Sequence, residues 1–205
     1  MNIRWNMFVY KLWAPVYDTF FNKGAFTGAR KEMFRSVPFE KGDRVLFVGV
    51  GTGADFEYVP ISDLRVTAID YSKDMLAIAK GKAIGKQIEF LEMDAQHLDF
   101  PPGSFDWVIG SLVLSVVPDG RKAFEEMVRV AKKEGYILIF DKFAPKDKSL
   151  SFFKKLIRPL VRLLGTDIGL SFENITKTSM NRVRIIEDTG ILFQGMYRKI
   201  VLRKH

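Results

Sequence analysis

Three glycines, Gly49, Gly51 and Gly53, alternate directly after the short apolar run of residues 45–48. A short apolar run that is rich in β-branched residues is typical of a buried strand. Glycines at its end let the backbone turn sharply and approach a ligand, because no Cβ atoms intervene. Ligands of open α/β sheets bind at the carboxyl ends of the strands, so this pattern predicts a site for a nucleotide-like cofactor.

An acidic residue occurs where such a cofactor needs one. Asp70 ends the apolar run 66–70, about 20 residues beyond the glycines, and a carboxylate there can accept hydrogen bonds from ribose hydroxyls. Gly49, Gly51 and Ala54 also fit the looser dinucleotide pattern G-x-G-x-x-G/A. A nicotinamide cofactor therefore stays open on these residues, since both cofactor types use such an acid.

The elements that must position these residues alternate between strand and helix. We predict strands over residues 44–50, 65–70, 87–93, 107–111 and 135–141. We predict helices over 73–82, with Ser72 as its cap, and near 122–132. Repeated βα units of this length predict a parallel sheet with helices on both faces.

The two ends of the chain have different patterns. Residues 1–37 are predicted to be helical and are unusually aromatic, with Pro15 separating two helices. Two antiparallel strands are predicted over 183–187 and 196–203, joined by turn residues at 188–190 and 194–195. The alternative is a helix over 180–188 followed by one final strand.

These elements predict one α/β domain over residues 1–205, a three-layer Rossmann-like sandwich with a mostly parallel seven-stranded sheet and a C-terminal antiparallel hairpin. Its expected parts are a helical N-terminal lid (1–40), a cofactor-binding core (44–141), a basic amphipathic helical insertion (142–180) and C-terminal strands (181–205).

Composition narrows the chemistry. The chain has no cysteine, which excludes disulfides and cysteine nucleophiles, and His97 and His205 are too few to predict a metal site. A net charge of +8 indicates an anionic partner. We find no secretory signal and no apolar run long enough to span a bilayer, so we expect a cytoplasmic protein or one peripheral to the inner membrane face.

In their order along the chain, the glycine run, Asp70, the Asp94-Ala95 step and residues 105–119 resemble the motifs of the class I S-adenosylmethionine-dependent methyltransferases. The resemblance covers residues 44–141 and implies S-adenosylmethionine as cofactor, with S-adenosylhomocysteine as product. It implies these contacts: Gly49, Val50, Gly51, Thr52 and Gly53 around the methionine part, Asp70 at the ribose, Tyr71 and Met75 beside the adenine, Asp94 and Ala95 at its amino group, and Ser111 and Leu112 near the methionine and the substrate.

Two positions depart from these simple assignments. The family usually has an acidic residue where this chain has Phe47, and Asp55 or Asp18 could substitute for it. Met75 could equally be an ordinary core residue of its helix.

The resemblance also limits the methyl acceptor. Methylation of C5 of pyrimidines usually needs a cysteine, which the chain lacks, and residues 110–113 do not match the motif used for amino groups of bases. Nucleic acid is therefore an unlikely substrate, and a small molecule or a lipid is expected. Because an ammonium group must lose a proton before it can attack, Tyr10, Tyr17 and Asp18 are candidates for the catalytic base.

Two segments favour a lipid. Residues 148–164 have apolar residues at helical spacing and a basic stripe, which suits either the surface of an anionic membrane or an ordinary helix packed on the sheet. The basic residues concerned are Lys154, Lys155, Arg158 and Arg162. The aromatic N-terminal segment suits a membrane interface or a lid over the cofactor.

Residues 16–21 and 195–198 resemble small bacterial phospholipid N-methyltransferases, and quinone-ring methyltransferases share the Tyr-Asp and Asp-Ala steps. We therefore expect methylation of a lipid amine such as phosphatidylethanolamine. The alternatives are a soluble metabolite or quinone as acceptor, a nicotinamide-dependent reductase, or a binding module without catalysis. The oligomeric state stays open.

Overall fold

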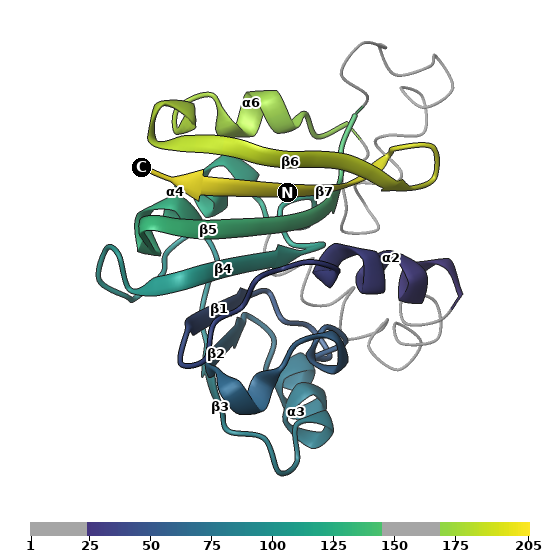
Figure 1. The fold of residues 1–205 in the computed structure, drawn as a ribbon, viewed down its shortest axis with the longest axis vertical. Coiled ribbons are helices and arrows are strands. Elements are labelled where there is room, and N and C mark those ends of the chain that lie inside the picture. The colour runs from purple at the N-terminus through teal and green to yellow at the C-terminus, as the bar shows by residue number, and fades with distance from the viewer. Residues whose placement is uncertain (1–23, 145–168) are drawn as a thin grey trace.

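The computed structural model describes residues 24–144 and 169–205. These residues form a seven-stranded sheet in the order β3-β2-β1-β4-β5-β7-β6, in which β7 runs antiparallel to both of its neighbours and the other pairs are parallel (Figure 1). The strands are β1 (Arg44–Val48), β2 (Arg65–Asp70), β3 (Ile88–Glu92), β4 (Phe105–Ser111), β5 (Ala131–Lys142), β6 (Val183–Leu192) and β7 (Tyr197–Lys204). The predicted fold class is thereby confirmed.

Burial on both faces of the central strands explains the layers. In β1, Leu46 and Val48 belong to the apolar cluster beneath α4 (Gly120–Val130) and α6 (Phe172–Thr176). Val45 and Phe47 belong to the opposite cluster, together with residues of α2 (Ala25–Phe34) and α3 (Lys73–Lys82). Alternate side chains of a strand point to opposite faces, so a continuous apolar run requires helices on both sides.

The helices begin where side chains cap them. The Ser72 hydroxyl accepts a hydrogen bond from the Met75 backbone N–H at 3.3 Å, and α3 spans the residues predicted for it. The Asp119 carboxylate accepts from the N–H groups of Arg121 and Lys122, so α4 begins two residues earlier than predicted. It also ends earlier, because β5 begins at Ala131 and pairs there with β4.

The C-terminal hairpin is confirmed, and its turn contains the predicted turn residues 194–195 but not 188–190. Residues 188–190 lie inside β6 and pair with residues 198–200 of β7. A buried ion pair between Arg198 and Asp188, with Nη2 to Oδ2 at 2.6 Å, holds this part of the ladder. The alternative helix over 180–188 is wrong, since Met180–Arg182 form a single 3-10 turn before the strand begins.

Some predicted elements fall outside the described residues, and others have different bounds. The helices expected over residues 1–23 and 148–164 are outside the described residues, whereas α2 lies in the helical region predicted over 1–37. Strands β1 and β3 are shorter at their ends than predicted. None of the described helices has the length and apolar character needed to cross a membrane.

We expect Asp119→Ala to lower the free energy of unfolding by about 1 kcal/mol, because the first turn of α4 loses its capping acceptor. Urea denaturation measures this change. Asp119→Asn keeps an acceptor oxygen and should lose clearly less. Equal losses in the two variants would mean that the acceptor oxygen of residue 119 does not stabilise the first turn of α4.

Candidate functional site

The glycine loop after β1 combines tight packing with one open position. All three of its glycines have positive φ, at 66°, 55° and 73°. A Cβ on Gly49 would lie 2.6 Å from a methyl of Val113, and one on Gly53 would lie 2.7 Å from the ring of Phe56. A Cβ on Gly51 would meet no heavy atom within 4 Å. The loop therefore closes on the core at both ends and leaves its middle exposed to a ligand.

Asp70, at the end of β2, fixes the middle of this loop. One carboxylate oxygen accepts from the Gly51 N–H at 2.8 Å, and the other accepts from the Ser72 N–H at 2.9 Å. Burial raises the pKa of Asp70, and hydrogen bonds from the backbone of Ser72, Gly51 and Tyr71 oppose that rise. A carboxylate has about four lone-pair sites, so both oxygens keep capacity for a ligand's hydroxyls.

Asp94, after β3, is oriented by a residue that sequence analysis missed. Its Oδ1 accepts from both the backbone N–H and the side-chain amide of Gln96, each at 2.9 Å. The carbonyl oxygen of the same Gln96 side chain accepts from the Asp119 N–H at 3.0 Å, at the start of α4. Gln96 thus connects Asp94 to the start of α4, the helix that follows β4. Nothing in the local sequence distinguishes it from a solvent-exposed glutamine.

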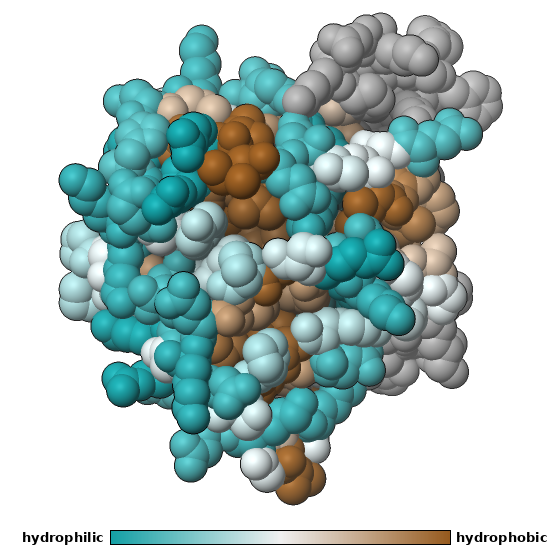
Figure 2. All heavy atoms as spheres, in the orientation of Figure 1, coloured by the Kyte–Doolittle hydropathy of each residue, from teal (hydrophilic) through white to brown (hydrophobic). Residues whose placement is uncertain are grey.

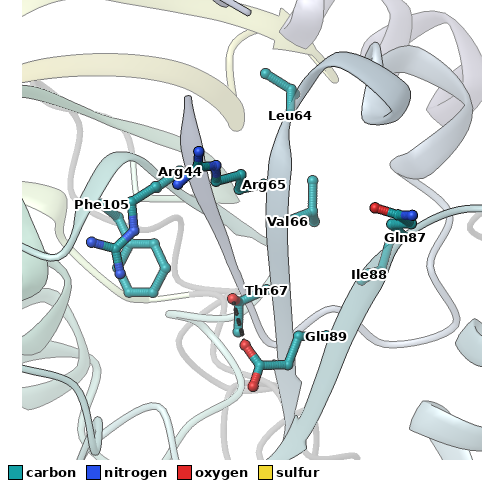
Figure 3. A pocket seen from close by; sticks show the side chains of 9 residues that line it. All are labelled: Arg44, Leu64, Arg65, Val66, Thr67, Gln87, Ile88, Glu89 and Phe105. Atoms are coloured by element: carbon teal, nitrogen blue, oxygen red, sulfur yellow. Dashed lines mark hydrogen bonds between the residues drawn. The ribbon is translucent and has the colours of Figure 1, made fainter. Parts of the chain in front are cut away.

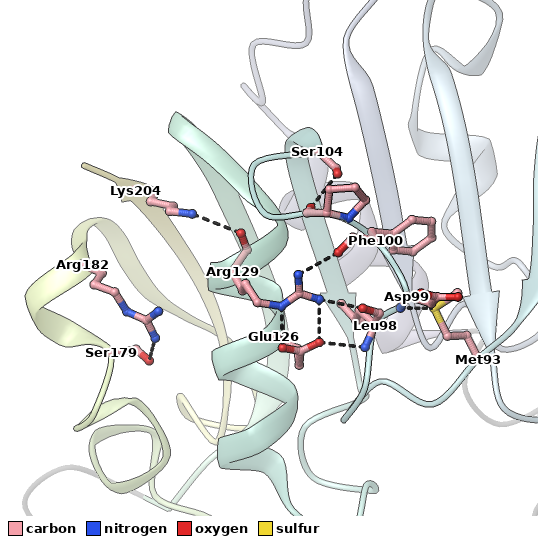
Figure 4. A network of polar contacts seen from close by, with 11 residues as sticks. Met93, Leu98, Asp99, Phe100, Ser104, Glu126, Arg129, Ser179, Arg182 and Lys204 are labelled. Carbon is pink, nitrogen blue, oxygen red and sulfur yellow. Dashed lines mark hydrogen bonds and ion pairs between the residues drawn. The ribbon is translucent and has the colours of Figure 1, made fainter.

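The connection that carries Asp94 is anchored further by a polar network on α4 (Figure 4). The Arg129 guanidinium donates to the carbonyl oxygens of Leu98 and Phe100 at 2.6 and 2.7 Å. The Glu126 carboxylate accepts from the Leu98 N–H at 2.8 Å, and its hydrogen bond from Arg129 lowers the Glu126 pKa. These contacts hold a segment without regular structure in one path.

The residues assigned to the adenine differ in exposure. The Tyr71 side chain is 40% exposed, so its ring is available to a ligand. Met75 and Ala95 are buried, and Ala95 is part of the apolar cluster under α4. Only the backbone of Ala95 is therefore suited to contact a ligand.

The end of β4 contains a strained residue. Leu112 has φ of 56°, and its N–H donates to the carbonyl oxygen of Phe140 at 2.7 Å. A leucine in the left-handed region is an outlier of the kind that clusters at functional sites. Asp141, the residue before the last of β5, is fully buried and accepts from the Ser115 N–H at 3.1 Å, which fixes the chain just beyond Leu112.

A buried ion pair joins three elements beside Ser111. The Arg30 guanidinium of α2 pairs with the Asp55 carboxylate of the glycine loop, and Arg30 Nη1 donates to the Ser111 hydroxyl at 3.2 Å. The side chains of Arg30 and Asp55 are only 5% and 8% exposed. Phe47, at the position expected to be acidic, instead packs edge-to-face on Phe56 at 5.5 Å. The sequence suggested Asp55 as a substitute but gave no sign of Arg30.

The structure brings most of the predicted residues together. The glycine loop, Asp70, Asp94 and Ser111 follow the carboxyl ends of four adjacent strands, β1, β2, β3 and β4. The catalytic candidates Tyr10, Tyr17 and Asp18 lie outside the described residues, as do Lys154, Lys155, Arg158 and Arg162. Among the side chains that are described, no three His, Asp or Glu residues gather to hold a metal ion.

A hollow of about 550 Å³ lies at the amino ends of the strands (Figure 3). The guanidinium of Arg44 lies over the Phe105 ring, 5.5 Å from its centroid. The Thr67 hydroxyl donates to Glu89 at 3.2 Å. This groove is at the end of the sheet opposite the glycine loop, so it is separate from the site described above.

The chain is similar in sequence to known methyltransferases. Residues 46–139 match the family model described as "Methyltransferase domain". A phosphatidylethanolamine N-methyltransferase from Cereibacter sphaeroides is 34% identical over 194 residues, covering 92% of each chain. A demethylmenaquinone methyltransferase from Lactobacillus johnsonii is 27% identical and covers 93% of this chain and 84% of its own.

Solved structures share the fold at lower identity. An S-adenosylmethionine-dependent methyltransferase from Thermotoga maritima superposes with a TM-score of 0.71 at 17% identity, covering 98% of this chain and all of its own. A second one, from Aquifex aeolicus, has a TM-score of 0.60 at 20% identity and covers 85% of this chain and 88% of its own.

We expect Asp55→Ala to lower the free energy of unfolding by about 3–5 kcal/mol, because it leaves the buried Arg30 without its counter-ion. Replacing both partners with apolar residues, as in Arg30→Met with Asp55→Leu, should recover most of this loss. Urea denaturation of the single and double variants measures the coupling. A loss below about 1 kcal/mol in Asp55→Ala would contradict the burial of this pair.

Proposed function

Because the chain belongs to the class I S-adenosylmethionine-dependent methyltransferases, we propose that it methylates the amino group of a phospholipid such as phosphatidylethanolamine at a membrane surface. Membership of this family means that its methyl donor is S-adenosylmethionine, and it argues against the nicotinamide alternative. The observation that supports the lipid acceptor is the 34% identity to a phosphatidylethanolamine N-methyltransferase across nearly the whole of both chains.

The open backbone at Gly51 and the oriented carboxylates of Asp70 and Asp94 support our assignment of the donor site. In our proposal the open position at Gly51 accepts the methionine part, together with Gly49, Val50, Thr52 and Gly53. The remaining assignments are Asp70 for the ribose hydroxyls, Tyr71 and Met75 beside the adenine, Asp94 and the Ala95 N–H for its amino group, and Ser111 and Leu112 toward the methionine and the acceptor. The two carboxylates of this set are already held, Asp70 by backbone N–H groups and Asp94 by Gln96.

The chemistry asks the protein mainly for alignment. When bound, S-adenosylmethionine supplies an activated methyl group on a sulfonium, which a neutral amine can displace in line. The Arg30–Asp55 pair locks α2 and the glycine loop together next to Ser111, so the walls of the site are fixed before a substrate arrives. Tyr10, Tyr17 and Asp18 remain our candidates to accept the proton that the ammonium must lose.

Contact with a bilayer is part of the proposal. The basic residues Lys154, Lys155, Arg158 and Arg162 are our candidates for contact with anionic headgroups, and the net charge of +8 favours such a surface. A second candidate function is methylation of a quinone ring. It is supported by the similarity to demethylmenaquinone methyltransferase over 93% of the chain.

We expect Asp70→Ala to weaken binding of S-adenosylhomocysteine by at least tenfold, because the ribose loses its acceptor and Gly51 loses its anchor. Isothermal titration calorimetry measures the affinity. Asp74→Ala removes an exposed carboxylate four residues along and serves as the control. An affinity in Asp70→Ala equal to that of the parent would refute the site.

We expect the protein to transfer label from methyl-labelled S-adenosylmethionine to phosphatidylethanolamine in mixed vesicles. Organic extraction followed by chromatography separates amine lipids from quinones. Label in a demethylated quinone, with none in phosphatidylethanolamine, would replace the first proposal by the second. Label only in soluble amines would contradict both lipid acceptors.

A further inference from the structure

The turn between β6 and β7 is apolar where a surface turn is normally polar. Residues 190–197 contain no charged side chain. Phe193 is 55% exposed, and Ile191, Leu192 and Met196 beside it are partly exposed. Figure 2 shows apolar surface gathered in this region, between the turn and α2.

The backbone of this turn is strained. Gln194 and Gly195 have φ of 55° and 85°, and the Met196 N–H donates to the Phe193 carbonyl at 3.2 Å, as in a type I′ turn. Phe193 itself has φ of 48°, which is unfavourable for an aromatic residue. Neither hydration nor backbone preference favours phenylalanine here. Contacts with Phe26 and Tyr197 cover only part of the residue, and the 55% that stays exposed is free for a contact outside the chain.

The turn is close to the candidate site. It lies at the carboxyl edge of the parallel strands, because both Lys142 and Leu192 pair with Tyr197. The Phe193 ring packs against Phe26 of α2, with centroids 6.1 Å apart. Arg30 follows Phe26 by four residues, about 6 Å along the helix, and contacts Ser111.

The surrounding charge suits an anionic surface. The chain leaves β5 beside this turn, where the Phe143 N–H donates to the Met196 carbonyl at 2.8 Å. It returns at Leu170, whose carbonyl accepts from the Ala144 N–H at 2.8 Å. The sequence between these two points, residues 145–168, contains six Lys or Arg and two Asp. The segment that is strongly basic in sequence therefore joins two described residues, Ala144 and Leu170, that lie close to the β6–β7 turn.

We propose that the β6–β7 turn, led by Phe193, inserts into the headgroup boundary of an anionic bilayer and so places the candidate site at the membrane surface. This inference rests on the proposed lipid substrate. A stable protein partner needs a face of about 800 Å², far more than this narrow tip offers, whereas a bilayer needs no complementary shape.

Phe193→Asn tests the proposal, because asparagine tolerates the left-handed backbone and is polar. We expect partitioning onto vesicles of phosphatidylcholine and phosphatidylglycerol (1:1) to fall about tenfold, with the melting temperature unchanged or higher. Ile84→Asn is the matched control. Ile84 is 84% exposed and precedes β3, the outermost strand on the side of the sheet away from β6. Its replacement should not affect partitioning. Equal partitioning of the parent and Phe193→Asn would overturn the proposal.

A second variant tests insertion directly. Phe193→Trp should gain a fluorescence component that shifts to the blue on vesicle binding and is quenched by brominated lipid. A component that stays solvent-exposed on the vesicles would also overturn the proposal. Sedimentation velocity tests a second copy of the chain as the occupant, and a dimer lost in Phe193→Asn with vesicle binding intact would assign the tip to that interface instead.

Other readouts separate this inference from the proposed activity. S-adenosylhomocysteine affinity should be the same in Phe193→Asn and in the parent, since residue 193 is not among the proposed cofactor contacts. Loss of that affinity would mean that the variant distorts the site, and would overturn a purely membrane-contacting role. If the parent failed to methylate any lipid but still bound vesicles through Phe193, the acceptor would be wrong and the tip right.

Discussion

The hydrogen bond from the Gly51 N–H to Asp70 is the constraint on which the site depends. It joins the loop after β1 to the end of β2, so two neighbouring strands present one surface. The bond requires Gly51 in the left-handed region and a buried carboxylate whose pKa is raised by that burial. Backbone donors offset this cost, and the open side of Gly51 is left free for a ligand.

The family's usual acidic residue is replaced by Phe47, and the contacts beside the glycine loop differ accordingly. Phe47 extends the apolar cluster under α2 and α3 by packing on Phe56. The negative charge is found at Asp55 instead, paired with the guanidinium of Arg30 from α2, the helix that precedes β1 in the chain. A buried pair of this kind adds little net stability but fixes one geometry, because either partner alone would be costly to bury. The departure from the family pattern is thus accompanied by a different, equally buried arrangement.

The two edges of the sheet differ in the way expected of an open α/β fold. The carboxyl ends of the strands hold the glycine loop, Asp70, Asp94, the strained Leu112 and the apolar β6–β7 turn, while the groove near Arg44 lies at their amino ends. The strained Leu112 and the exposed Phe193 are therefore on the side where ligands of such folds bind. Helix α2 connects the β6–β7 turn with the candidate site, since Phe26 contacts Phe193 and Arg30 contacts Ser111.

Local signals in the sequence were sufficient for much of the molecule. The apolar period of residues 65–70, the Ser72 cap and the glycine run predicted β2, α3 and the loop correctly, because each depends on neighbours within a few positions. The tertiary structure decided the rest. Arg30, Asp55 and Ser111 meet across 81 residues, and Gln96 joins Asp94 to Asp119. Residues 188–190 have turn-forming types, yet pairing with β7 makes them a strand, and of the two predicted sets of turn residues only 194–195 form the turn. Contacts between distant segments set these outcomes, and no local pattern encodes them.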